Sequence, residues 1–305
     1  MSTVKSSAGA IELAGVRMTN PDKVLYPEQG TTKLELARYY LEVERWILPH
    51  LANRPLTLVR CPQGRAQKCF YQKHVSGHEP KSIRRLEIAE KEGSSTYMAV
   101  RDVAGVLALV QLGVLELHLW GSHADKVDKP DRVVIDLDPA PGVPFGRVTE
   151  AALELRERFE ESGLESFAMT TGGKGLHVVM PIQRGPSFDE VKAFARSVAE
   201  RLAKERPREF VAQMSKARRE GRIFVDYLRN ARGATAICPY STRARPGCPV
   251  ATPLRWEEVT AKLDPTKLDL DTVPKRVKRA KRDPWERYAE VRQRLTSAAR
   301  GSWRE

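Results

Sequence analysis

Short apolar segments typical of strands alternate with amphipathic helical segments, and this order most constrains the fold. Residues 132–138 form an apolar, strand-like run that Pro139 ends. A helical pattern follows over 145–162, and two strand-like runs joined by a glycine-rich turn occupy 167–181. A second helical pattern covers 188–205. Helices mixed with paired strands predict an α/β or α+β chain.

The first 120 residues contain the same two kinds of segment. A helix is expected over 33–51 behind a threonine cap, and another over 103–113 between Asp102 and Gly113. Strands are expected at 56–60, 69–74, 97–100 and 114–120. This half therefore adds strands and helices of its own to the α/β pattern.

The two ends of the chain differ in composition from the rest. Residues 1–10 are small and polar, and we expect a loose terminus there. Residues 274–305 begin with a basic segment, and a short terminal helix is expected over 284–295. No repeat and no clear linker before residue 262 is visible, and a length of 305 residues allows one large domain or two ordinary ones.

The charge balance narrows the class of partner. Lysine and arginine total 52 against 39 acids, a net charge of +13, which favours nucleic acid first and an anionic membrane surface second. No apolar run approaches the roughly 18 residues of a membrane span. The N-terminal residues lack the apolar core of a secretory signal. Four cysteines without a CxxC pair favour a reducing cytoplasm over a disulfide scaffold.

Three acids in strand-like segments suggest a metal site. Asp136 and Asp138 are two residues apart, so a strand would point both carboxylates to one face. Asp226 follows the apolar run Ile223 to Val225, where a carboxylate needs a partner. Three such carboxylates could hold two divalent metal ions, as in phosphoryl-transfer sites. The plainer alternatives are a solvated strand end for the first two and an ion pair with Arg229 or Arg222 for the third.

The glycine-rich turn TTGGKGLH at 170–177 suggests an anion site. Its glycines allow backbone N–H groups to approach a ligand closely, while Lys174 adds a charge and Thr171 a hydroxyl. It is no Walker A loop, because Ala168 and Gly175 stand where that pattern needs glycine and a hydroxyl residue. The plainer alternative is an ordinary hairpin turn with a surface lysine.

Two weaker signals lie in the first half. Cys61 and Cys69, near His74 and His78, are too widely spaced for a structural zinc site, so we expect unrelated buried thiols and surface histidines. The aromatic residues of CFYQKH alternate with charges, as in strands on which nucleic-acid bases stack. A strand with one buried and one exposed ring is the alternative.

The order of DLDP, TGGKGLHV and FVDYLRN resembles the three motifs of the archaeo-eukaryotic primase superfamily. Within that superfamily the chain resembles the polymerase domain of bacterial ATP-dependent DNA ligase D. The resemblance extends through NPDKVLYP, TTKLELARYY, FYQKH, LELHLW and YSTRAR, nearly the whole chain. It implies a single primase-polymerase domain over 1–305, with a primase-type catalytic core, an RRM-like sheet and a companion α/β module. It also implies template-directed nucleotidyl transfer that prefers ribonucleotides and fills gaps at broken DNA ends in non-homologous end joining.

The resemblance also implies roles for particular residues. The implied catalytic and metal-binding residues are Asp136, Asp138 and Asp226, with Mn²⁺ preferred to Mg²⁺. The implied nucleotide contacts are Thr171, Gly172, Gly173, Lys174, His177, His118, Arg229 and Arg243. The implied pocket for a DNA 5′-phosphate is Asn20, Lys23 and Lys33, and the implied template-stacking pair is Phe70 and Tyr71. Threonine at 171 and tyrosine at 71 depart from the more usual serine and phenylalanine.

The partners expected from the resemblance are gapped or broken DNA with a 5′-phosphate, NTP or dNTP, Ku and a DNA ligase domain. Binding to a membrane is not expected. A cytoplasmic, nucleoid-associated location in a bacterium is expected. Two other classes of function stay open, a non-catalytic nucleic-acid end-binding module and a metal-dependent nuclease. The three acids argue against the first, and the glycine-rich turn with its nearby arginines argues against the second. Both a standalone protein and a piece of a larger ligase are compatible with the sequence.

Overall fold

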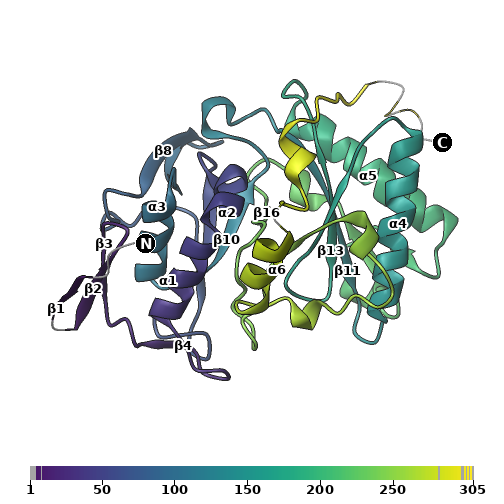
Figure 1. The fold of residues 1–305 in the computed structure, drawn as a ribbon. Coiled ribbons are helices and arrows are strands. Elements are labelled where there is room, and N and C mark those ends of the chain that lie inside the picture. Colours follow the sequence, from purple (N-terminus) through teal and green to yellow (C-terminus); the bar gives the residue numbers. More distant parts are fainter. Residues whose placement is uncertain are drawn as a thin grey trace. The chain divides into compact units, whose positions relative to one another are not determined.

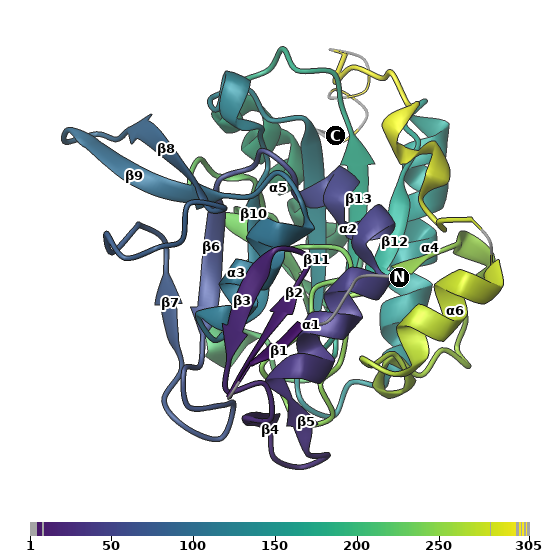
Figure 2. The same cartoon turned by 60° about the vertical axis from the view of Figure 1, so that its left-hand side comes forward.

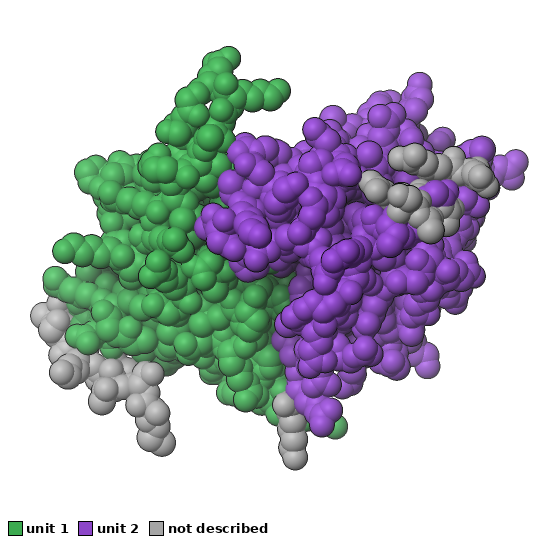
Figure 3. Space-filling view, turned by 90° about the horizontal axis from the view of Figure 1, so that it is seen from above, with its two compact units in different colours: residues 1–120, 237–251, 266–281 green, residues 121–236, 252–265, 282–305 purple. Residues whose placement is uncertain are grey.

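Two six-stranded β-sheets, each with its own helices, are the main elements of the fold (Figure 1, and Figure 2 from a second side). The computed structural model describes residues 5–7, 9–280, 282–296, 299, 301 and 303. Unit 1 comprises residues 1–120, 237–251 and 266–281, and unit 2 comprises residues 121–236, 252–265 and 282–305 (Figure 3). The single domain over 1–305 stays a prediction. Within the described residues, no helix is long and apolar enough to cross a membrane.

The sheet of unit 2 has the strand order β14-β15-β11-β13-β12-β17, and only β14 and β15 are parallel. Its strands are β11 (Arg132–Pro139), β12 (Phe167–Thr170), β13 (Leu176–Pro181), β14 (Phe210–Val211), β15 (Ile223–Asp226) and β17 (Pro253–Leu254). Helices α4 (Phe145–Glu161) and α5 (Phe188–Glu205) both pack against β11. Along the chain, β11-α4-β12-β13-α5-β15 is the βαββαβ order of ferredoxin-like and RRM-like sheets. The predicted α/β class with an RRM-like sheet is confirmed.

Unit 1 is the companion α/β module. Its main sheet has the order β16-β10-β6-β9-β8, with β7 paired to β6, although only Ile237 of β16 belongs to unit 1. Figure 2 labels β6 to β10 of this sheet. These strands are β6 (Leu56–Arg60), β7 (Phe70–Gln72), β8 (Arg84–Ala89), β9 (Ser94–Ala99), β10 (Val114–Trp120) and β16 (Thr235–Ile237). Smaller sheets join β1 (Lys5–Ser7), β2 (Ala10–Leu13) and β3 (Val16–Thr19), and β4 (Val24–Tyr26) with β5 (Thr31–Thr32). Its helices are α1 (Lys33–Glu42), α2 (Glu44–Leu51), α3 (Val103–Gln111) and α6 (Thr272–Ala280).

Short 3-10 helices complete both units. They are η1 (Ala124–Lys126), η2 (Lys216–Arg218), η3 (Leu228–Asn230), η4 (Trp256–Glu258), η5 (Pro265–Lys267) and η6 (Glu286–Ala289). Of these, η3 directly follows the third acidic motif.

Local capping sets the helix starts as the sequence predicts. Thr32 caps α1 through a capping box with Glu35, and the Asp102 carboxylate accepts a hydrogen bond from Gly105 N–H at the start of α3. The predicted helix over 33–51 is wrong in one respect. The backbone at Val43 has ψ of 7°, so α1 ends there and α2 begins. The apolar spacing continues through this bend, and therefore the pattern could not reveal it.

The chain ends also differ from expectation. Of the predicted loose terminus over 1–10, Lys5–Ser7 form β1 and Ala10 begins β2, while residues 1–4 and 8 lie outside the described residues. The predicted helix over 284–295 is only the single turn η6. Gln293 explains why, because its carbonyl accepts from Gln183 N–H and its side-chain amide donates to the Pro181 carbonyl. These hydrogen bonds fasten the segment to the end of β13 and not to itself.

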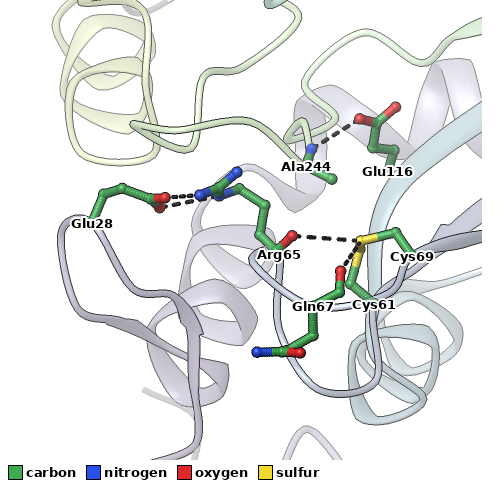
Figure 4. The surroundings of a disulfide bond; sticks show 7 residues. All are labelled: Glu28, Cys61, Arg65, Gln67, Cys69, Glu116 and Ala244. Carbon is green, nitrogen blue, oxygen red and sulfur yellow. Dashed lines mark hydrogen bonds and ion pairs between the residues drawn. A yellow bond between two sulfur atoms is a disulfide. The ribbon is translucent and has the colours of Figure 1, made fainter.

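A disulfide bond closes the loop between β6 and β7 (Figure 4). Cys61 and Cys69, expected to be unrelated thiols, have Cα atoms 4.3 Å apart and are bonded. The pairing of β6 with β7 explains this bond. Arg60 lies opposite Phe70, so Cys61, which follows Arg60, meets Cys69, which precedes Phe70. Cys238 and Cys248 are buried and take no part in this bond.

Replacing both bonded cysteines, Cys61→Ser with Cys69→Ser, should lower the free energy of unfolding by about 2–3 kcal/mol, because the bond restricts the unfolded chain. The measurement is urea unfolding with and without a thiol reductant. The reduced wild-type protein and the double variant should have the same midpoint. A wild-type midpoint that does not respond to the reductant would contradict the bond.

Candidate active site

Three buried polar side chains form a row across the centre of the unit 2 sheet. Asp136 on β11 lies opposite His177 on β13 and opposite Asp226 on β15. Opposite residues of antiparallel strands point to the same face, so the three side chains share one face. Asp136 is 6% exposed, His177 3% and Asp226 7%. The fold thus brings residues of three separate sequence motifs together.

Arg229 lies between the two acids of this row. Its Nε is 3.1 Å from Asp136 Oδ2 and 3.3 Å from Asp226 Oδ2. His177 Nε2 is 3.5 Å from the same oxygen of Asp136. The ion pair that was the plainer alternative for Asp226 is therefore present, and it is shared with Asp136.

Asn230, the residue after Arg229, is bonded to the backbone of β11, a role that sequence reasoning missed. Val134 N–H donates to Asn230 Oδ1 at 2.8 Å, and Asn230 Nδ2 donates to the Val134 carbonyl at 2.7 Å. The amide side chain thus replaces a strand partner for β11 just beyond β15. Its place at the end of FVDYLRN was the only signal in the sequence.

Asp138 stands at the exposed end of β11. Its side chain is 53% exposed, and its Oδ2 is 3.4 Å from Arg219 Nη1. Arg219 lies over the ring of Phe224, with its guanidinium carbon 3.7 Å from the ring centroid, and Phe224 is the residue opposite Asp138. Strand pairing therefore also positions this cation, which sequence reasoning missed.

The three carboxyl groups influence one another electrostatically. Burial alone would raise the pKa of Asp136, but His177 and Arg229 lower this pKa to about 2. Burial raises the pKa of Asp138, and the charge of Asp136 raises it further against Arg219 and Lys174. Burial also raises the pKa of Asp226, which Arg229 opposes. The site therefore favours further positive charge.

The donor chemistry of the three acids fits a hard divalent cation, because Mg²⁺ and Mn²⁺ prefer carboxylate oxygens. As the described side chains stand, however, no three or more His, Cys, Asp or Glu groups are close enough to hold a metal ion. Arg229 provides the positive charge between Asp136 and Asp226. Metal binding by these acids would therefore require side-chain rearrangement, and the ligand assignment stays a prediction.

The glycine-rich turn between β12 and β13 lies close against β11. A side chain at Gly175 would place its Cβ 2.6 Å from the Leu137 carbonyl oxygen, so only glycine allows this approach. Thr171 donates to the Gly175 carbonyl from both its N–H, at 3.1 Å, and its hydroxyl, at 3.2 Å. Gly172 has a φ of +64°, and exposed Lys174 lowers the pKa of Asp138. The turn thus presents its lysine on the side of the acids.

Two predicted nucleotide contacts, His118 and Arg243, meet in unit 1. His118 Nε2 is 2.8 Å from Glu116 Oε2, and Arg243 Nε is 3.0 Å from the same oxygen. Glu116 was missed from the sequence, although its spacing of two from His118 on an expected strand was a signal. The fold thus joins a strand residue to the distant YSTRAR motif.

The predicted 5′-phosphate residues also lie together in unit 1. Lys23 N–H donates to the Asn20 carbonyl at 3.1 Å, and Lys33 N–H donates to the Lys23 carbonyl at 2.8 Å. Burial lowers the pKa of Lys33, and the positive charge of Lys23 lowers it further. Two ammonium groups therefore repel one another here, and an anion would relieve that repulsion.

Both rings of the predicted stacking pair are exposed on β7. Phe70 is 41% exposed and Tyr71 71%, which excludes the alternative of one buried ring. The Arg60 guanidinium carbon lies 5.5 Å from the Phe70 ring centroid, and the Tyr71 ring lies 6.3 Å from that of His118. Such rings are available to stack on bases.

Comparison with known proteins gives consistent matches. Residues 32–285 match the family described as "LigD, primase-polymerase domain". The Multifunctional non-homologous end joining protein LigD of Pseudomonas aeruginosa is 38% identical over 299 residues, which is 97% of this chain and 36% of that protein. The Mycolicibacterium smegmatis protein of the same name is 37% identical over 246 residues, 80% of this chain and 32% of that protein. The chain thus spans about a third of the length of these relatives.

A solved structure shares the fold. The "Polymerase Domain from Mycobacterium tuberculosis Ligase D in complex with DNA" is 33% identical, with a TM-score of 0.84 over 90% of this chain and 98% of that one. The resemblance inferred from the sequence motifs is therefore confirmed. The chain belongs to the LigD primase-polymerase domain family and is a nucleotidyltransferase domain.

Proposed function

We propose that the chain adds nucleotides, preferably ribonucleotides, to templated DNA at gaps and broken ends during non-homologous end joining. The observation that best supports this is the row of His177, Asp136 and Asp226 beside the close-packed turn with Lys174. It combines carboxylates for metal ions with a cationic, glycine-rich loop for phosphate. The relatives named for end joining and the related domain in complex with DNA agree with the proposal.

In this proposal Asp136, Asp138 and Asp226 hold two divalent metal ions, with Mn²⁺ preferred to Mg²⁺. Bound there, the ions would lower the pKa of the primer 3′-hydroxyl and offset the charge of the triphosphate. Asp136 is suited to this role because its lowered pKa, about 2, keeps it ionised.

The basic side chains of unit 2 would bind the triphosphate. Exposed Lys174, with the N–H groups of Gly172 and Gly173, would bind phosphate oxygens from a turn in which glycine permits close approach. Thr171, whose N–H and hydroxyl donate to the Gly175 carbonyl, would turn its hydroxyl toward the phosphates. His177 and Arg229, already in contact with Asp136, would turn toward phosphate oxygens. We propose His118 and Arg243 as further nucleotide contacts. Lys174 and His177 would help to stabilise the charge that develops on the leaving pyrophosphate.

The remaining predicted residues would recognise DNA. Lys23 and Lys33, with Asn20, would bind the 5′-phosphate across the gap, because an anion relieves their mutual repulsion. Exposed Phe70 and Tyr71 would stack on template bases. We also propose a ligase domain and Ku as partners, and a cytoplasmic location on the bacterial nucleoid.

The variant Asp138→Ala should lose extension of a gapped, 5′-phosphorylated DNA with Mn²⁺ by roughly 10²-fold or more, because it removes a metal ligand worth several kcal/mol. Its affinity for DNA should change little. Asp125→Ala is the matched control, since it removes one exposed acid that is paired with Arg184. Extension by Asp138→Ala at the wild-type rate would refute the assignment. Shortened DNA with the wild-type protein would indicate a nuclease, and a mobility shift alone would indicate an end-binding module.

Ribonucleotides should be incorporated more efficiently than deoxyribonucleotides by roughly 5- to 150-fold. This is the range for a buried polar group left unpaired when the 2′-hydroxyl is missing, about 1–3 kcal/mol. Single-nucleotide kinetics with matched bases would measure the ratio of kcat/KM. A preference for the deoxy sugar would count against the proposal.

Lys23→Ala and the shape-preserving Lys33→Met should reduce the affinity gap between 5′-phosphorylated and 5′-hydroxyl gapped DNA. The expected loss for phosphorylated DNA is about 1.5–3 kcal/mol, the value of a charge-assisted hydrogen bond. Lys278→Ala, which removes an exposed lysine paired with Glu42, is the control for a general loss of charge. Equal weakening of both DNAs by the pocket variants would mean that no dedicated pocket exists.

A further inference from the structure

Glu116 is a buried acid in a strongly basic protein, and its partners identify its role. It lies on β10 two residues before His118, so both side chains point to the same face of the sheet. It is 5% exposed. A buried carboxylate needs compensating partners, and those of Glu116 are two residues proposed above to contact the nucleotide.

Both carboxylate oxygens of Glu116 are used. Oε2 lies 2.8 Å from His118 Nε2 and 3.0 Å from Arg243 Nε. Oε1 accepts a hydrogen bond from Ala244 N–H at 2.9 Å (Figure 4). One carboxylate therefore fixes an imidazole, a guanidinium and the backbone that carries the guanidinium.

The charge of Glu116 persists despite burial. Burial alone would raise the pKa of Glu116, but the hydrogen bond of His118 and the charge of Arg243 lower it to about 2. The ionised carboxylate holds both side chains, the imidazole through a hydrogen bond and the guanidinium through an ion pair. His118 and Arg243 are therefore oriented before a triphosphate binds, which reduces the reorganisation needed on binding.

We propose that Glu116 is a positioning residue that holds His118 and Arg243 together, oriented for the incoming nucleoside triphosphate. This inference rests on the proposed function, in which His118 and Arg243 contact the nucleotide. Glu116 itself does not contact the nucleotide, because a carboxylate facing the triphosphate would repel it. It acts only through its two neighbours.

The test compares Glu116→Gln, which keeps the shape and removes the charge, with Glu87→Gln, which changes an exposed glutamate of the same unit on β8. Glu116→Gln should raise KM for nucleotides by on the order of tenfold, with a smaller change in kcat and no change in affinity for gapped DNA. Binding of a fluorescent ATP analogue should weaken by a similar factor. Glu87→Gln should behave as the wild-type protein. Wild-type nucleotide affinity in Glu116→Gln, or an equal loss of DNA affinity, would overturn the proposal.

A double-mutant cycle separates positioning from a general structural role. In the Arg243→Ala background, Glu116→Gln should weaken nucleotide binding much less than in the wild-type background, because the group that it orients is gone. If Glu116→Gln reduces nucleotide affinity by the same factor in both backgrounds, the proposal is overturned. If Glu116→Gln does not fold, the cycle of His118→Ala with Arg243→Ala replaces it, and independent losses there would also overturn the proposal. Failure of the wild-type protein to extend any primer while it still binds the ATP analogue would instead count against the proposed function.

Discussion

The structure of the candidate site depends on carboxylates placed at the centre of an apolar sheet. Asp136 lies between fully buried Ile135 and Leu137, where an ionised group is stable only beside opposite charge. Arg229 provides that charge beside Asp136, while Arg219 and Lys174 provide it for Asp138 at the end of the same strand. A local feature lies beside each of these three cations. Asn230 binds the β11 backbone behind Arg229, the Phe224 ring supports Arg219, and Gly175 lets the loop of Lys174 approach β11.

Unit 1 contains both a buried anion and a buried cation, and each needs opposite charge nearby. Glu116 is the buried anion, and it contacts His118 and Arg243. Lys33 is the buried cation, and the charge of nearby Lys23 lowers its pKa. The first arrangement is neutralised within the protein. The second retains repulsion that an external anion can relieve, which makes it the better candidate for binding a phosphate group.

The sequence predicted most helices and strands because their determinants are local. Helix α5 was expected over 188–205 and has those bounds, and α3 begins at its Asp102 cap and ends before Gly113. The errors have non-local causes. The helix over 284–295 is replaced by hydrogen bonds of Gln293 to the end of β13, and Cys61 reaches Cys69 because β6 pairs with β7. Neither the hydrogen bonds of Gln293 nor the pairing of β6 with β7 can be predicted from residue spacing along the chain.

By itself the sequence determined the α/β class, the strand character of the acidic motifs and, through their order, membership of the primase-polymerase family. These three properties depend on the periodicity and residue types within short segments, and such local patterns do not depend on the tertiary structure. Only the tertiary structure decided that Asp226 faces Asp136, that Arg229 bridges them and that Glu116 joins His118 to Arg243. The physical reason is that each contact joins separate elements: a shift of one residue between β11 and β15 would turn Asp226 away from Asp136, and Arg229 and Arg243 reach the acids from segments outside the strands.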